Sequence, residues 1–208
     1  MGLRIDPSSF PPPGVDEVAR PEETRTIVLG GGLFWCADAL YRQLKGVVSV
    51  RPGYAGGAKT DARFEAVSGG HTQHAFVVEI VYEPAKLSLG QILQVFFSIA
   101  HDPTASGRKA AAASGPQRSV IHYTTPAQER IAANYIRRLQ QVGVFDSLIQ
   151  TDVTPLSSFF EAEPLHHDYA ASHPRDHHVR MVTLPKLAKL RKLHATWLTP
   201  SAPRDPED

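Results

Sequence analysis

A short strand that runs into three consecutive glycines and then into a helix is the feature that most constrains this chain. Residues 26–29 read as a strand, Gly30, Gly31 and Gly32 follow, and residues 34–44 carry apolar side chains at helical spacing. The glycines let the chain turn sharply and let another group approach the backbone closely. The free N–H groups and positive dipole end of the next helix favour an anion or a thiolate. Neither a Walker sequence nor a spaced G-x-G-x-x-G follows, so we expect no nucleotide cofactor.

The rest of the chain mixes strand and helix patterns without strict alternation and without an internal repeat. We expect further strands at 47–50, 75–82, 119–123 and 148–153, and helices at 89–100, 126–141 and 185–193. Both ends are rich in proline and lack apolar periodicity. The sequence therefore predicts one α+β domain over 24–198, with helices packed on a sheet, a disordered or surface-draped arm over 1–23 and a disordered tail over 199–208.

Composition excludes several classes of protein. The chain has 208 residues, with 22 Lys and Arg against 21 Asp and Glu, so its net charge of +1 provides no field for nucleic acid. Its single cysteine excludes an intramolecular disulfide, a Cys-x-x-Cys pair and a cysteine-rich zinc site. No apolar run is long enough to cross a membrane, and the first residues do not form a signal peptide. We therefore expect a cytoplasmic protein that does not bind membranes.

Several segments carry a resemblance to a known family. In chain order they are GGLFWC at 31–36, PGYAGG at 52–57, SGGHTQHAFVVEIVYEP at 68–84, HDP at 101–103, QRSVIHY at 117–123, FFEAEPLHHDYAASHP at 159–174 and LPKLAKL at 184–190. On these segments the chain resembles the A-type peptide methionine-sulfoxide reductases, which reduce the S epimer of methionine sulfoxide. The resemblance implies an α+β fold, a two-layer sandwich with a mixed sheet and a glycine-rich turn leading into the active-site helix.

The family's catalytic positions hold other residues in this chain. The resemblance places the nucleophilic cysteine directly before the Phe34–Trp35 pair, the acidic glutamate after His74-Ala75, and two tyrosines and an aspartate at further positions. The residues that stand at these five positions are Leu33, Phe76, Phe64, Gln117 and Ala112. The Phe34–Trp35 pair, which in the family cages the substrate's methyl group, is kept, as are His74, His166 and Tyr169.

The changed positions lead to our leading hypothesis. Sulfoxide reduction needs a thiolate to attack sulfur and an acid to protonate the departing oxygen, and neither Leu33 nor Phe76 supplies these groups. We therefore expect a repurposed relative that does not reduce sulfoxides by the thiol mechanism and that binds or transforms a small, partly apolar molecule or peptide. The expected ligand pocket comprises Leu33, Phe34, Trp35, Phe64, Phe76, Gln117, His166 and Tyr169. The alternative for this pocket is a collapsed aromatic core.

The ten histidines raise a second question about chemistry. Imidazole suits iron, copper or zinc, and a site with an open position would be catalytic. Four histidines are candidate ligands beside the altered pocket: His71, His74, His167 and His177. No HxH or HExxH spacing is present, and surface or structural histidines are the favoured alternative.

Two other functional classes stay open. The first is a catalytically dead scaffold that keeps the fold for protein interactions. The second is a peptide-methionine (S)-S-oxide reductase that uses Cys36, which lies one turn inside the predicted helix. Burial at that depth raises a thiol pKa, so we expect Cys36 to be unreactive unless its surroundings compensate.

Overall fold

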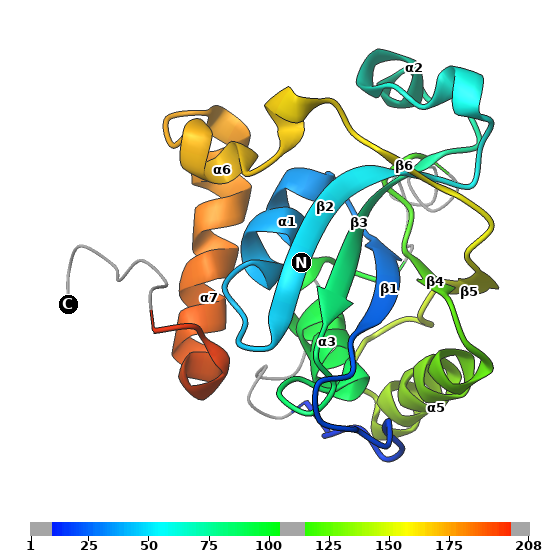
Figure 1. Cartoon of the computed structure of the whole chain (residues 1–208), viewed down its shortest axis with the longest axis vertical. Helices are drawn as coiled ribbons and strands as arrows, with labels where there is room; N and C mark the ends of the chain where they lie inside the picture. The colour runs from blue at the N-terminus through cyan, green and yellow to red at the C-terminus, as the bar shows by residue number, and fades with distance from the viewer. Residues whose placement is uncertain (1–9, 105–114, 201–208) are drawn as a thin grey trace.

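A six-stranded mixed sheet organises the computed structural model, which describes residues 10–104 and 115–200. Its strands are β1 (Arg25–Gly30), β2 (Val47–Ala55), β3 (Ala75–Tyr82), β4 (Val120–Tyr123), β5 (Asp152–Pro155) and β6 (Phe159–Glu161). They are ordered β5-β4-β1-β3-β2-β6, and every pairing is antiparallel except that of β4 with β5 (Figure 1). The predicted α+β class, a mixed sheet with packed helices, is confirmed.

Helices pack on this sheet and also extend beyond it. The longer ones are α1 (Phe34–Tyr41), α3 (Leu89–Val95), α5 (Pro126–Val142) and α7 (Leu184–His194). Short helical segments are η2 (Lys59–Asp61), α2 (Phe64–Ser68), η3 (Phe96–Ala100), η5 (Pro164–His166), α6 (Tyr169–Ser172), η6 (Val179–Thr183) and η7 (Ala195–Trp197). Helix α1 contacts β2 and β3 on one side and α6 and α7 on the other. It is therefore sandwiched between the sheet and the C-terminal helices, as Figure 1 shows.

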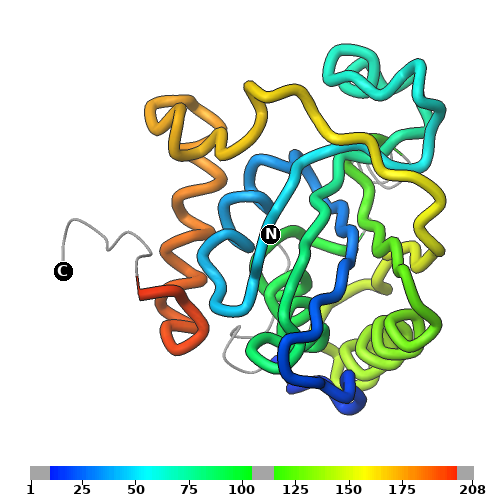
Figure 2. The backbone as a smooth tube through the Cα atoms, in the orientation of Figure 1, coloured from blue at the N-terminus to red at the C-terminus, as the bar shows by residue number. Residues whose placement is uncertain are grey.

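The strands alternate between a large core and a small one. On β1, Ile27 and Leu29 belong to the large cluster that the helices cover, whereas Val28 belongs to the second cluster. Strand β3 follows the same period of two, with Val78 in the first cluster and Val77 in the second. The second cluster lies against the chain that follows β5, which Figure 2 shows running back across the sheet toward η5.

Local sequence signals place the helix starts accurately. The Ser88 side chain accepts a hydrogen bond from Gln91 N, and the Gln91 side chain caps Ser88 N in return, which completes a capping box at α3. Thr125 caps α5, where Pro126 occupies the first turn. Helix α5 ends at Gly143, whose φ of 71° lies in the left-handed region that favours glycine.

Two expected boundaries differ from the structure. The strand predicted at 148–153 is instead β5 at Asp152–Pro155, because Leu148 is 68% exposed and the strand begins only where it pairs in parallel with β4. The helix predicted at 34–44 ends at Tyr41, after which tighter backbone hydrogen bonds, such as Leu44 N to Tyr41 O, continue the turn.

The N-terminal arm is packed on the domain from residue 10 onward, rather than disordered. Phe10 is 4% exposed and its ring meets Phe145 edge-on at 6.0 Å between centroids. The Asp16 carboxylate accepts hydrogen bonds from Ser88 Oγ and from Gly90 N. Glu17 accepts a hydrogen bond from the Tyr82 hydroxyl at 2.8 Å. These long-range contacts compensate for the segment's lack of periodicity; residues 1–9 and 201–208 lie outside the described residues.

Candidate active site

The glycines after β1 shape the entry into α1. Gly32 has a φ of 101°, which side chains with a Cβ rarely adopt, and its N–H donates to Gln117 O at 3.1 Å. A Cβ on Gly31 would lie 2.6 Å from the His101 ring, so only glycine allows this histidine so close to the backbone. Leu33 is then the extended N-cap residue of α1, and no side chain caps the helix.

Aromatic side chains gather at this end of α1. The Phe34 ring is 1% exposed and lies 5.0 Å from Phe76 and 6.0 Å from Phe64, measured between centroids. Trp35 stacks on Tyr169 at 3.9 Å and on Phe64 at 5.6 Å. These contacts bring together most of the predicted pocket from α1, α2, β3 and α6. The aromatic rings contact one another, so this cluster is packed as an aromatic core as well as being positioned as a pocket wall.

The remaining predicted pocket residues lie at the edge of that cluster. His166 Nδ1 accepts a hydrogen bond from Trp35 Nε1 at 3.3 Å, and its ring lies 4.4 Å from that of Phe64. Burial lowers the pKa of His166 below its ordinary value, although nearby Glu163 opposes this effect. Gln117 joins the site through its backbone carbonyl while its side chain is exposed. Ala112 lies outside the described residues.

Two carboxylates that were not predicted from the sequence, the partly exposed Glu163 and the buried Asp38, hold this arrangement together. Glu163 accepts hydrogen bonds from the Tyr54 hydroxyl at 2.6 Å and from Phe64 N at 2.9 Å. Burial acts to raise the pKa of Glu163, but these hydrogen bonds hold it below its ordinary value. Asp38 accepts from Asp168 N at 3.0 Å, which ties α1 to the segment that carries Tyr169.

Asp38 is fully buried, and burial raises the pKa of its carboxyl to about 6, although Arg42 at 2.8 Å opposes this shift. Long-range contacts of this kind leave no local pattern in the sequence. Glu163 does lie within one of the segments that carry the family resemblance, which was the available signal.

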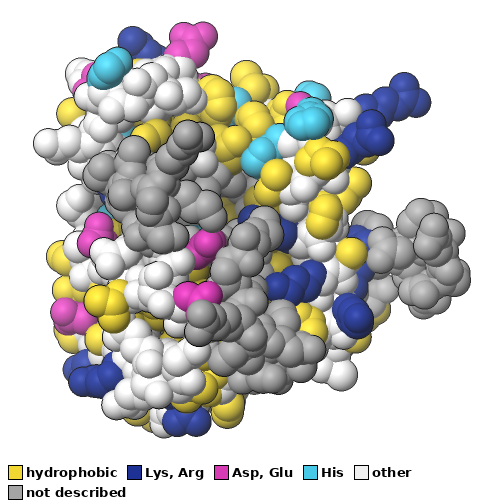
Figure 3. Space-filling model, turned by 180° about the vertical axis from the view of Figure 1, so that it is seen from behind, with side chains coloured by type: hydrophobic (Ala, Val, Ile, Leu, Met, Phe, Trp, Pro, Cys, Tyr) yellow, Lys and Arg dark blue, Asp and Glu magenta, His cyan; other side chains and the backbone are white. Residues whose placement is uncertain are grey.

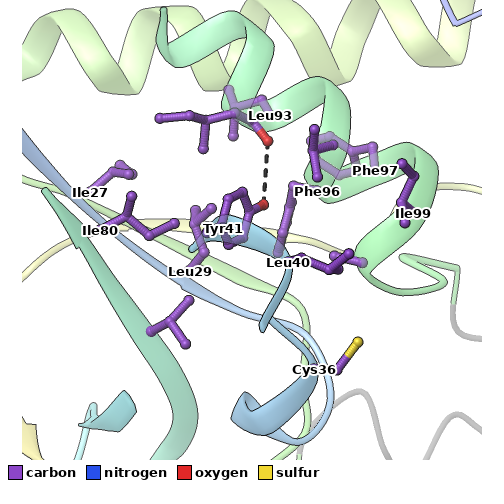
Figure 4. Packing of buried hydrophobic residues seen from close by; sticks show 14 of the residues in the cluster. Ile27, Leu29, Cys36, Leu40, Tyr41, Ile80, Leu93, Phe96, Phe97 and Ile99 are labelled. Atoms are coloured by element: carbon purple, nitrogen blue, oxygen red, sulfur yellow. Dashed lines mark hydrogen bonds between the residues drawn. The ribbon is translucent and has the colours of Figure 1, made fainter. Parts of the chain in front are cut away.

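The single cysteine is buried on α1, two residues beyond Phe34. Successive helical residues are about 100° apart, so a step of two points Cys36 to the opposite side of α1 from Phe34. Its side chain is 5% exposed and points away from Tyr41 and Leu93, at the edge of the cluster drawn in Figure 4. Burial raises the pKa of the Cys36 thiol, while the Lys186 ammonium and the Thr183 hydroxyl act to lower it. Lys186 and Thr183 therefore offset part of the rise in the thiol pKa that burial causes.

The candidate metal ligands are not brought together. His74 accepts from Gly57 N at 3.2 Å and its other ring nitrogen bonds to Ala58 O, so both nitrogens serve the loop. His167 contacts Ala162 O and Glu161. His71 and His177 are exposed, and Figure 3 shows histidines at the surface on the side that carries α6. Within residues 10–104 and 115–200 no three His, Cys, Asp or Glu side chains form a group that could hold a metal ion. The four-histidine metal hypothesis is therefore not supported.

The fold and the site define a class: an α+β enzyme-type domain in which a glycine turn after the central strand positions an aromatic pair and a nearby thiol. The chain belongs to the peptide methionine sulfoxide reductase family, whose model matches residues 25–197. Within the described residues no helix is long and apolar enough to span a membrane.

Individual relatives agree with this assignment. A peptide methionine sulfoxide reductase MsrA 2 of Synechocystis sp. is 38% identical over 95% of this chain and 98% of its own. An MsrA of Granulibacter bethesdensis is 40% identical over 80% and 90%. Among solved structures, reduced Mxr1 from Saccharomyces cerevisiae superposes with a TM-score of 0.66 at 26% identity, covering 79% of this chain and 93% of that one.

These relatives overturn the leading functional hypothesis. A repurposed protein that does not reduce sulfoxides by the thiol mechanism was expected from five changed positions, yet relatives at 38–40% identity over most of the chain are named as sulfoxide reductases. Leu33 and Phe76 exclude a thiol and an acid only at the family's usual positions, and Cys36 lies outside those positions. The alternative with Cys36 is favoured instead.

Proposed function

We propose that this protein is a peptide-methionine (S)-S-oxide reductase whose thiol is Cys36. The observation that carries the proposal is the close relationship to proteins named as peptide methionine sulfoxide reductases over nearly the whole chain. Because sulfoxide reduction by this route needs a thiol and the chain has one cysteine, that thiol must be Cys36.

The Lys186 ammonium supports this role, because a positive charge beside a thiol stabilises the thiolate. In the reaction the Cys36 sulfur attacks the sulfoxide sulfur, and the oxygen passes to the cysteine. The thiol becomes a sulfenic acid and the sulfoxide becomes a thioether, so two electrons move from one sulfur to the other. An external dithiol then reduces the sulfenic acid, releases water and leaves as a disulfide. The single cysteine requires this external reductant, since no second cysteine is present to form a disulfide within the chain.

The test is steady-state turnover of a peptide containing methionine S-sulfoxide with dithiothreitol as reductant. Wild-type protein should form methionine and should not reduce the R epimer, while Cys36→Ser should form none. A matched control is Ser68→Ala, which changes a hydroxyl at the end of α2 and leaves the thiol in place. Absence of turnover in the wild-type protein, or full turnover in Cys36→Ser, would contradict the proposal.

A further inference from the structure

Met181 stands at the edge of a small cavity between η6, α7 and η3. It is one of two methionines in the chain, and the other is Met1. Met181 is 64% exposed, although Val179 and Thr183 on the same short helix are buried. It also lines a cavity of about 200 Å³, together with residues of η3 and α7. Met181 therefore contacts both the solvent and the cavity.

An exposed thioether is a site of oxidation. Hydrogen peroxide transfers one oxygen to the sulfur, so the O–O bond breaks, an S–O bond forms, and the peroxide leaves as water. The sulfur loses two electrons and the peroxide gains them. The product sulfoxide is polar, and its oxygen is a stronger hydrogen-bond acceptor than the thioether sulfur. The effect of this change on the protein depends on which groups can donate to the new oxygen.

The cavity contains a hydroxyl suited to that oxygen. Ser98 lines the cavity from η3 and is 0% exposed, and its Oγ has no hydrogen-bond partner among the described residues. A buried hydroxyl without a partner costs free energy, so natural proteins rarely keep one without a reason. The hydroxyl gains little from the thioether, because sulfur is a weak acceptor, whereas a sulfoxide oxygen would satisfy it.

The rest of the lining suits the other parts of a methyl sulfoxide. Ile99, Phe145 and Val182 offer apolar contact to its carbon atoms. Lys186 also lines the cavity, and its Nζ donates to Ala100 O at 2.6 Å. The ammonium carries three hydrogens, and its positive charge favours the partial negative charge of a sulfoxide oxygen. The cavity therefore combines apolar walls with a donor and a positive charge.

We infer that Met181 is an oxidation site of this protein and that its sulfoxide oxygen accepts a hydrogen bond from Ser98 within the cavity. The flexible methionine side chain can turn its sulfur from the solvent toward Ser98 without a change of backbone. The new bond joins η6 to η3, beside the existing packing of α7 against η3. Peroxide thus strengthens this part of the fold. The inference is independent of the proposed function, because neither Cys36 nor turnover enters it.

The test compares the melting temperature Tm before and after treatment with hydrogen peroxide. It uses the wild-type protein and Cys36→Ser, in which no thiol consumes peroxide or reduces the sulfoxide. Peptide mass spectrometry first establishes that Met181 carries one added oxygen. We expect Tm to rise by about 2–4 °C in both proteins, the shift that one net hydrogen bond gives in a chain of this size.

Two variants locate the effect. Ser98→Ala removes the donor, and it should not lower Tm before oxidation, because that hydroxyl has no partner to lose among the described residues. After oxidation of Met181 this variant should show no rise. Leu148→Met combined with Met181→Leu moves the methionine to a position that is 68% exposed and outside the cavity lining. Oxidation at residue 148 should give no rise either.

Two results would overturn the inference. One is a fall in Tm, or no change, when Met181 is oxidised; an unchanged value would mean that water satisfies Ser98 as well as the sulfoxide does. The other is an equal rise in Ser98→Ala or in the chain with the relocated methionine. NMR of labelled methionine methyl groups adds a readout besides stability. The methyl signal of oxidised Met181 should be broader than in oxidised Ser98→Ala, and equal widths would count against the hydrogen bond.

Discussion

The chemistry of this protein depends on one thiol in an environment that opposes its ionisation. Burial raises the pKa of Cys36, and only Lys186 and Thr183 act against this effect. The neighbouring Tyr41 hydroxyl is itself fully buried and has its pKa raised well above the ordinary value, so it remains a neutral group at working pH. Cys36 therefore has less thiolate at neutral pH than an exposed cysteine does.

Alkylation of Cys36 should show this environment directly. The thiolate is the reactive form, so the rate of reaction with iodoacetamide should rise about tenfold for each pH unit below the thiol pKa. Because that pKa is raised, we predict that the rate still rises between pH 8 and pH 9, and that turnover rises in parallel. Lys186→Met should make alkylation slower at every pH. A rate that levels off below pH 7 would contradict the assigned environment.

Contacts at the residue scale also explain what the sequence could reveal. The glycine turn, the aromatic pair and the cysteine were predictable because all three lie within one short segment, residues 30–36, whose pattern is local. Glu163 and Asp38 act through hydrogen bonds to residues about a hundred or more positions away, such as Phe64 N and Asp168 N, and no local pattern reports such a partner. The position of Lys186, which donates to Ala100 O, likewise depends on the packing of α7 against η3.

At the scale of elements, α1 determines which thiol positions are activated. Its N-cap is Leu33, in extended backbone and without a side-chain cap, so the first N–H groups of the helix have no side-chain partner there. Cys36 lies within the helix, where the free N–H groups and the helix dipole stabilise a thiolate less strongly. The starts of α3 and α5 were predictable because a capping residue, Ser88 or Thr125, stands directly before each helix, whereas the limits of β5 follow from its parallel pairing with β4.

A cysteine placed at the N-cap should be more acidic than Cys36. In Leu33→Cys combined with Cys36→Ser, the thiol meets the helix N–H groups and is only partly buried, and both conditions favour the thiolate. We predict faster alkylation at pH 7 than in the wild-type protein. The matched control is Ala37→Cys combined with Cys36→Ser, which puts a partly buried cysteine inside the same helix. Equal alkylation rates for the two variants would show that the helix start does not activate a thiol.

At the scale of the whole molecule, the N-terminal arm completes the large core. The segment wraps around α3 and α5 through Phe10, Asp16 and the Tyr135 hydroxyl, which donates to Pro11 O at 3.0 Å. Its proline-rich sequence gave no sign of this, because the partners of Phe10, Asp16 and Glu17 lie far along the chain, at Phe145, at the start of α3 and in β3. The domain was therefore predictable in class and not in its full extent.

Removing the Phe10 ring should destabilise the whole domain. Phe10→Ala leaves a space against Phe145 and should lower the free energy of unfolding by about 2–4 kcal/mol, near the range for buried aromatic residues. Val18→Ala changes a side chain that is 84% exposed in the same arm and should alter stability by less than about 0.5 kcal/mol. Urea denaturation followed by circular dichroism measures both, and equal midpoints would show that the arm does not contribute to the core.

The most direct test of the central claim is a single turnover without added reductant. Fully reduced protein is mixed with excess methionine S-sulfoxide, and free methionine and the oxidation state of Cys36 are measured together by mass spectrometry after trapping with dimedone. The proposed function predicts one methionine formed per chain and an equal amount of dimedone adduct on Cys36. Formation of no methionine, or of methionine while Cys36 stays reduced, would contradict it.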